Sequence, residues 1–155
     1  MADTITIQKD DLSGPEIASL LQRHLDHMHS ITPAESVYAL DIDGLRVPEI
    51  TFWAAWDGDD LVGCVALKDH GDGLGEIKSM HTLAERRGQG IARKLLETLM
   101  DEARSRRMER LSLETGRTEH FRPAQELYRR YGFGETGPFA DYGDDPHSYF
   151  MTRVI

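Results

Sequence analysis

Residues 76–103 carry the pattern that most restricts the possible folds of this chain. Residues 76–83 are typical of a strand, residues 84–90 form a turn with two glycines, and an amphipathic helix begins directly after Gly90. One face of that helix is apolar at helical spacing, with Ile91, Leu95, Leu96, Leu99, Met100 and Ala103. A helix with such a face must bury it against another element, which predicts a fold that packs helices on a sheet.

The turn at residues 84–90, which we call the glycine turn, has the features of an anion site. The first N–H groups of a helix lack internal partners and carry the positive end of the helix dipole. Gly88 and Gly90 leave room for a phosphate, and Arg86 and Arg87 add positive charge. The sequence therefore predicts a pyrophosphate site here, and the alternative is an ordinary tight turn with two solvated arginines.

The remaining segments complete a pattern that mixes strands with helices. Strands are predicted at residues 4–8, 50–56, 61–67, 110–114 and 148–155, with one more from Phe133 onward. A helix opens at Ser13, which we expect to cap it, a shorter one runs from Thr32 to about Leu40, and another covers residues 122–131. This order predicts one mixed sheet of the α+β class with helices on both faces, and we expect residues 1–155 to form a single domain.

Composition and charge argue against several classes of function. The chain has 18 basic and 27 acidic residues and a net charge of −9, so it repels nucleic-acid and anionic-membrane phosphates on average. No stretch approaches the ~18 consecutive apolar residues of a membrane helix, and the amino terminus lacks a signal-peptide pattern. We therefore expect a cytoplasmic protein with no nucleic-acid or membrane partner. Cys64, the single cysteine, lies in an apolar run that predicts a buried strand position.

The glycine turn matches neither of two familiar nucleotide motifs. The P-loop string G-x-x-x-x-G-K-[ST] occurs nowhere in the chain, and Gly88-Gln89-Gly90 lacks the third glycine of the dinucleotide fingerprint. The chain does contain R-x-x-G-x-A, at Arg87, Gly90 and Ala92, immediately after a predicted strand. This motif resembles the acyl-CoA signature Q/R-x-x-G-x-G/A of the GCN5-related N-acetyltransferase (GNAT) superfamily.

A second segment resembles the same superfamily. Residues 124–133, AQELYRRYGF, are similar to its helix-to-strand motif A-x-x-L-Y-x-x-x-G-F, and Phe121 stands where many members carry asparagine. The order of the predicted elements also matches, so the resemblance covers nearly the whole chain. It implies a GNAT-like fold, with a central mixed, mostly antiparallel sheet of about seven strands flanked by about four helices.

The resemblance implies an acyl-CoA site formed mainly by the main chain. The pyrophosphate would be held by Arg87, Gly88, Gln89, Gly90, Ile91 and Ala92. The preceding strand corresponds to the one that hydrogen-bonds the pantetheine arm and that can hold the thioester carbonyl, which implies a role for Met80, His81 and Thr82.

Two side chains match catalytic positions of the superfamily. Tyr128 matches the tyrosine that protonates the departing CoA thiolate, and the alternative is that it only packs its helix on the sheet. Glu76 lies four residues before Met80, at the offset of the general base of histone-acetylating members. The alternative for Glu76 is an exposed carboxylate that balances Lys78.

Three histidines in one predicted helix raise the question of a metal site. His24 and His27 share a face, whereas His29 lies well around the helix, and no cysteine or carboxylate in the run completes a tetrahedral set. We therefore predict no metal. These histidines are either polar residues of the helix end or part of the acceptor pocket, which the first two helices of the superfamily line.

Together these features predict an acyl-CoA-dependent N-acetyltransferase. Acetyl-CoA is the expected donor, and an unidentified primary amine would attack the thioester directly in a ternary complex. The alternative is an acyl-CoA-binding sensor or interaction module without turnover, which would need neither Tyr128 nor Glu76. The last strand, residues 148–155, is expected to be an exposed edge through which a homodimer could pair.

Overall fold

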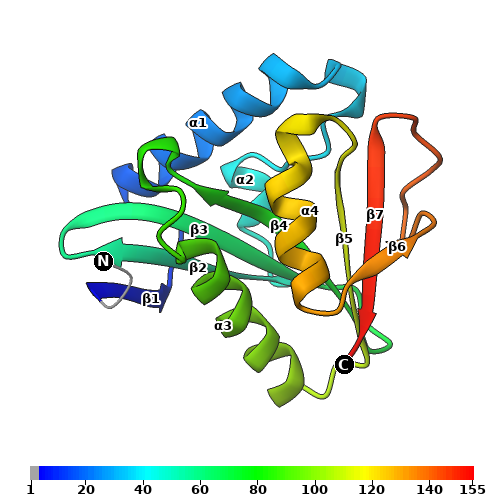
Figure 1. The fold of residues 1–155 in the computed structure, drawn as a ribbon. Coiled ribbons are helices and arrows are strands. Elements are labelled where there is room, and N and C mark those ends of the chain that lie inside the picture. Colours follow the sequence, from blue (N-terminus) through cyan, green and yellow to red (C-terminus); the bar gives the residue numbers. More distant parts are fainter. Residues whose placement is uncertain (1–3) are drawn as a thin grey trace.

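Two apolar runs form the long hairpin at the centre of the sheet. β2 (Ile50–Asp57) and β3 (Asp60–Asp69) pair antiparallel, with Ile50 opposite Lys68. β1 (Ile5–Lys9) pairs with β2, and β4 (Leu74–Thr82) pairs with β3, both antiparallel. The computed structural model, which describes residues 4–155, thus begins with four neighbouring antiparallel strands (Figure 1).

The rest of the sheet is reached through a helical crossover. The chain leaves β4, forms α3 (Ile91–Ser105) and returns as β5 (Arg110–Gly116), parallel to β4. After α4 (Arg122–Arg130), β6 (Gly134–Thr136) and β7 (Ser148–Val154) complete the order β1-β2-β3-β4-β5-β7-β6. The predicted mixed, mostly antiparallel sheet of seven strands flanked by helices is therefore confirmed.

Alternation along the strands divides the core between the two faces of the sheet. Trp53 and Val65 pack with α3 and α4, whereas Phe52 and Cys64 pack with α1 (Pro15–Ile31) and α2 (Ile42–Leu45). Cys64 is fully buried, as predicted. Figure 1 shows α3 and α4 on the near face of the sheet, and α1 runs behind the tip of β4. Across residues 4–155, no helix combines the length and the apolar character that crossing a membrane requires.

Two predictions about the helices were wrong. Gly14, not Ser13, is the N-cap of α1, because the Ser13 hydroxyl donates to the carboxylate of Asp11 instead. The second helix is limited to a 3₁₀ turn at Ala34–Ser36, after which residues 37–41 have no regular secondary structure. Tertiary hydrogen bonds replace it, since the Ser36 and Tyr38 hydroxyls both donate to Asp145, more than 100 residues later.

The predicted edge position of the last strand was also wrong. β7 lies between β5 and β6, and β6 pairs with it at Phe150, Met151 and Thr152. The sequence signal for β6 is only three residues long, so its pairing could not be inferred from pattern alone. β7 therefore does not provide the exposed edge through which a homodimer was predicted to pair.

Candidate active site

β4 and β5 separate after a short parallel ladder. The ladder runs from the Leu74–Arg110 pair to the Ile77–Leu113 pair and ends there, although both strands continue for several residues. In β4 the register against β3 shifts after Lys78, and Ser79 has a φ of 55°. Such a bulge bends the strand away from its neighbour. Beyond Ile77, the edge of β4 that faces β5 has no strand partner in the described chain.

The glycine turn leads directly into α3 and leaves its first N–H groups available. Gly90 is the N-cap, no side chain caps the helix, and the first turn has no acidic residue. Gly88 and Gly90 have φ values of 79° and 80°, in the left-handed region that favours glycine. A Cβ added at Gly88 would meet no atom within 4 Å. This combination of open space, unpaired N–H groups and helix dipole suits a phosphate.

The two arginines of the glycine turn have different surroundings. Arg86 forms an ion pair with Asp57 and donates to the side chain of Gln89 (3.1 Å). The guanidinium of Arg86 also lowers the pKa of Asp57. Its charge is therefore balanced, contrary to the expectation that both arginines serve an anion. Arg87 is exposed and has no ion pair with any residue of 4–155, so it is the arginine of this turn that can meet a ligand.

The side chains of Met80, His81 and Thr82, the β4 residues predicted for the acyl-CoA site, lie in different environments. Met80 packs on the α3 side of the sheet, and the ring of His81 lies 4.8 Å from that of His24 in α1. The hydroxyls of Thr82 and Ser79 are buried and have no hydrogen-bond partner among the described residues. Buried hydroxyls are seldom left unpaired, so these two can serve a ligand that lies along the open edge of β4.

The helix histidines do not form a metal site in the described part of the chain. His24 is 8% exposed, whereas His27, one turn later in α1, and His29 are exposed. Burial lowers the pKa of His24 to about 4 and that of His81 to about 3, so both rings are neutral at pH 7. Residues 4–155 bring no three histidine, cysteine or acidic side chains close enough to hold a metal ion.

Tyr128 lies in α4, on the face of the sheet that α3 also covers. It is 4% exposed, stands edge-on to Phe133 and belongs to the same core cluster as Ile77 and Leu113, the last pair of the β4–β5 ladder. Its hydroxyl has no hydrogen bond within residues 4–155, and burial raises its pKa. The side chain thus packs the helix on the sheet, and its hydroxyl keeps its proton.

Phe121 closes the end of β5 in place of the asparagine of many relatives. Its ring covers Gly116 so closely that a Cβ added at Gly116 would lie 2.1 Å from it. The side chain of Gln125 donates to the carbonyl of Gly116 (2.6 Å). The end of β5 is therefore fixed by packing and by an amide from α4.

Glu76 lies on the opposite face of the sheet, inside a network of donors. It is 2% exposed, and Oε1 lies 2.8 Å from Nε2 of His70. Oε2 accepts hydrogen bonds from Lys78 (3.2 Å) and from the hydroxyl of Tyr142 (2.5 Å). The alternative of an exposed carboxylate was wrong, although its contact with Lys78 is present. Burial, followed by the charge of Glu76, raises the pKa of Tyr142, so this hydroxyl keeps its proton.

Glu114, which the sequence analysis did not single out, lies one residue past the end of the ladder. Leu111 and Leu113 face the α3 side, so Glu114 faces the side of Glu76. It accepts a hydrogen bond from Ser148 (2.8 Å), and burial raises its pKa to about 7. The alternation in β5 was the available signal, because it places a carboxylate on the inner side of a strand next to the separation.

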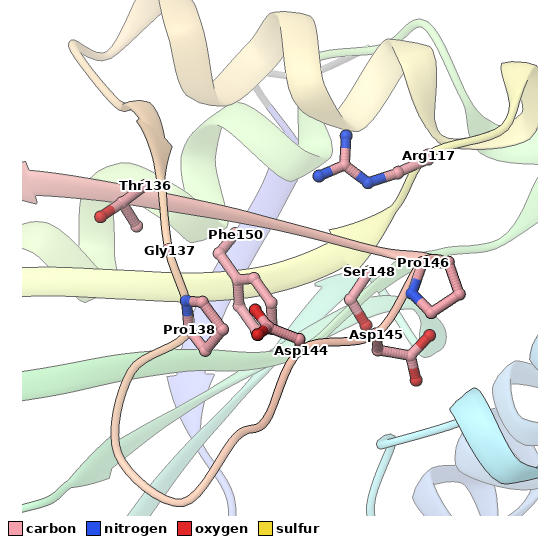
Figure 2. A pocket seen from close by; sticks show the side chains of 9 residues that line it. All are labelled: Arg117, Thr136, Gly137, Pro138, Asp144, Asp145, Pro146, Ser148 and Phe150. Carbon is pink, nitrogen blue, oxygen red and sulfur yellow. The ribbon is translucent and has the colours of Figure 1, made fainter.

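The connection from β6 to β7, residues 137–147, covers this face. Its Tyr142 contacts the ring of Tyr38 edge-on, and the Tyr38 hydroxyl donates to Asp145 (2.6 Å). We call Glu76, Lys78, Glu114, Tyr142 and Asp145 the polar cluster. A hollow of about 320 Å³ is lined by residues that include Pro138, Asp144, Asp145, Pro146, Ser148 and Phe150. Figure 2 shows the side chains that line it. Since Ser148 lines the hollow and binds Glu114, the hollow adjoins the polar cluster.

Comparisons with known proteins agree with this geometry. The model of a family described as acetyltransferase (GNAT) matches residues 15–133. The uncharacterized N-acetyltransferase YsnE of Bacillus subtilis is 50% identical over 149 residues, which is 96% of this chain and 99% of YsnE. The crystal structure of an acyl-CoA N-acyltransferase from Klebsiella pneumoniae is 29% identical, with a TM-score of 0.81 and 99% of both chains covered. A GNAT acetyltransferase from Elizabethkingia anophelis, solved with acetyl-CoA bound, shares the fold at 19% identity, with a TM-score of 0.69 and 99% of both chains covered.

Proposed function

Because this chain belongs to the acetyltransferase (GNAT) family and is an N-acetyltransferase, we propose that it transfers the acetyl group of acetyl-CoA to a primary amine by direct attack. The observation that carries the proposal is the separation of β4 from β5 next to the glycine turn. It provides an open strand edge and a phosphate site in one continuous surface. No described residue favours the non-catalytic alternative.

The donor substrate is expected to bind along this surface. Its pyrophosphate would accept hydrogen bonds from the main chain of residues 87–92, with Arg87 beside it. Its pantetheine arm would pair with the open edge of β4 at Met80, His81 and Thr82, as an added strand does. The thioester then lies between Tyr128 on one face of the sheet and the polar cluster on the other. The buried, unpartnered hydroxyls of Ser79 and Thr82 support this placement.

The reaction replaces the C–S bond of the thioester by a C–N bond. An amine arrives as an ammonium ion and loses two protons in total before the amide is formed. A carboxylate of the polar cluster takes the first proton and frees the nitrogen lone pair that attacks the carbonyl carbon. Tyr128 gives a proton to the leaving sulfur and regains one from the nitrogen, which accounts for the second. No covalent intermediate on Cys64 is needed, since its thiol is fully buried.

Two carboxylates are candidates for the first proton. Glu76, the residue indicated by the sequence, already accepts hydrogen bonds through Oε2 from two donors and has His70 at Oε1, so it would act through Tyr142 or His70. Glu114 has a single donor, Ser148, and a pKa near neutrality that suits direct proton uptake. Both side chains belong to the polar cluster, on the face of the sheet opposite Tyr128. We propose that Glu114 takes the proton from the ammonium directly and that Glu76 takes it through Tyr142 or His70.

The test is an initial-rate study with acetyl-CoA and a set of primary amines, in which the released CoA thiol and the acetylated product are both measured. Direct attack predicts double-reciprocal plots that intersect. Parallel lines would show an acetyl-enzyme and contradict the mechanism, and binding of acetyl-CoA without product from any amine would contradict the proposed acceptor.

A further inference from the structure

The charges of the polar cluster do not balance. Lys78 is its only lysine or arginine, and its ammonium group already binds Glu76 and the Tyr142 hydroxyl (2.9 Å). The side chains of this pair are 9% and 3% exposed, so the pair is largely withdrawn from water. Lys78 is therefore paired with Glu76, and Glu114 and Asp145 have no ion pair with it.

Glu114 and Asp145 receive only neutral donors. Glu114 accepts from the Ser148 hydroxyl, and Asp145 accepts from two hydroxyls and from the main-chain N–H of His147. Within residues 4–155, no lysine or arginine lies within ion-pair distance of either carboxylate. The hydrogen bonds to Asp145 lower its pKa and keep it ionised, whereas burial disfavours the ionised form of Glu114. A cation that binds beside the two carboxylates would offset the cost of ionising Glu114.

The walls beside these carboxylates are apolar and aromatic. Phe139, Tyr142 and Phe150 pack against one another with ring centroids 5.0 to 6.0 Å apart. Phe150 also lines the hollow of Figure 2, together with Pro138 and Pro146. Arg117 also lines the hollow, but its guanidinium lies 5.2 Å from the ring centroid of Tyr149, on the α4 side of the sheet, and it is paired there with Glu135 (3.5 Å). The site thus offers apolar surface and negative charge, and no uncommitted cation for a substrate carboxylate.

We infer that the acceptor is a primary amine without a carboxylate beside its amino group, whose ammonium is bound by Glu114 and Asp145 and whose apolar body lies against Phe150 in the hollow. This inference rests on the proposed function and narrows it to one substrate class. Amino acids are disfavoured because their carboxylate would be brought next to two others without a cation to receive it.

The charge state of Glu114 depends on groups from several elements. The titratable groups that face it or its neighbour Asp145 are Tyr38, Glu76, Lys78, Tyr142, Asp145 and His147. Desolvation is the main cause of its raised pKa, and the charge of Lys78 opposes it. A bound ammonium adds a positive charge beside Glu114, which favours the ionised carboxylate.

The experiment compares 2-phenylethylamine with phenylalanine, which differ only by the carboxylate on the carbon that bears the amino group. Acetyl-CoA is the donor, and kcat/KM is measured at pH 8 for the wild type, Glu114→Gln and the control Glu126→Gln. Glu126 is exposed on α4 and lies outside the site. We expect the wild type and the control to prefer phenylethylamine about 100-fold, as a buried like-charge contact would give. Glu114→Gln should reduce this preference to below about tenfold.

The change in preference separates recognition from proton uptake, because loss of a proton acceptor lowers kcat/KM for both probes by the same factor. Equal use of the two probes by the wild type, or an unchanged preference in Glu114→Gln, would overturn the inference and leave the proposed function intact. No turnover of either probe would also overturn it. The wider amine set then decides the proposed function separately.

Discussion

Replacing Gly88 by alanine tests the phosphate site with a single methyl group. The φ of 79° places Gly88 in the left-handed region, where an L-residue costs about 1 kcal/mol. The added Cβ would contact no protein atom within 4 Å, so no packing is lost or gained. We therefore expect the free energy of unfolding to fall by about 1 kcal/mol, which lowers Tm by about 3 °C in a chain of this size.

The effect on acetyl-CoA binding should be larger than this conformational cost. The methyl group would occupy the open space beside the first N–H groups of α3, where the phosphate oxygens are expected. Loss of one hydrogen bond to a charged group, at about 1.5–3 kcal/mol, raises Kd by roughly 10- to 150-fold. Isothermal titration calorimetry with acetyl-CoA measures Kd, and thermal unfolding measures the stability loss in the same samples.

Gly71→Ala is the matched control. Gly71 has a φ of 81°, has no atom within 4 Å of an added Cβ and lies in the turn between β3 and β4. Its variant should lose the same ~1 kcal/mol of stability and keep the wild-type Kd within about twofold. A Gly88→Ala protein that binds acetyl-CoA as tightly as the control would refute the assignment of the glycine turn.

Four further predictions concern single positions. Tyr128→Phe should lower kcat about 100-fold and leave the Kd for acetyl-CoA unchanged, and an unaltered kcat would remove Tyr128 from the mechanism. Cys64→Ala should keep kcat within about twofold, because burial raises the pKa of this thiol and no covalent step needs it; loss of turnover under stable folding would contradict this. Glu114 has a pKa raised from 4.5 to about 7, so the folded state holds a proton that the unfolded state releases, and stability should fall as pH rises through this window. The free energy of unfolding, measured by urea titration, should fall from pH 5 to pH 8 by on the order of 1–2 kcal/mol more in the wild type than in Glu114→Gln, after allowance for solvent screening at this side chain. An equal fall in both proteins would show that the pKa of Glu114 is not raised. Gly116→Ala should cost about 2–3 kcal/mol in urea unfolding because its methyl group would overlap the Phe121 ring, and a smaller cost would mean that the ring can move.

Local patterns were sufficient for most of the fold and for the strand, turn and helix around the glycine turn. The apolar stripe of α3 and the glycines before it are consecutive in sequence, so strand, turn and helix could be predicted together. The same holds for residues 124–133, which place Tyr128 on α4. In these segments the local preference and the tertiary structure favour the same conformation.

The polar cluster could not be predicted in this way, because its environment is assembled from distant segments. Glu76 is buried by Tyr142, which is 66 residues later in the chain. Glu114 owes its raised pKa to burial beneath segments that include Ser148, 34 residues later. Tyr38 donates to Asp145 from a stretch without regular secondary structure, and it is not in the predicted helix. Periodicity identifies the inward face of a strand, but it does not identify which loop will cover that face.

The short ladder between β4 and β5 has a consequence for how the molecule moves. Four residue pairs, Leu74–Arg110 to Ile77–Leu113, are the strand pairing that joins β1–β4 to β5–β7 in the described chain. Amide hydrogens of residues 78–82 and 114–116 that face the gap should therefore exchange with solvent deuterium faster than those of the β2–β3 hairpin. Acetyl-CoA bound in the gap would pair with the open edge of β4 and slow the exchange of its amide hydrogens. Because only these four pairs of the described residues hold β4 to β5, separation of the two parts of the sheet about the ladder would affect how quickly CoA leaves.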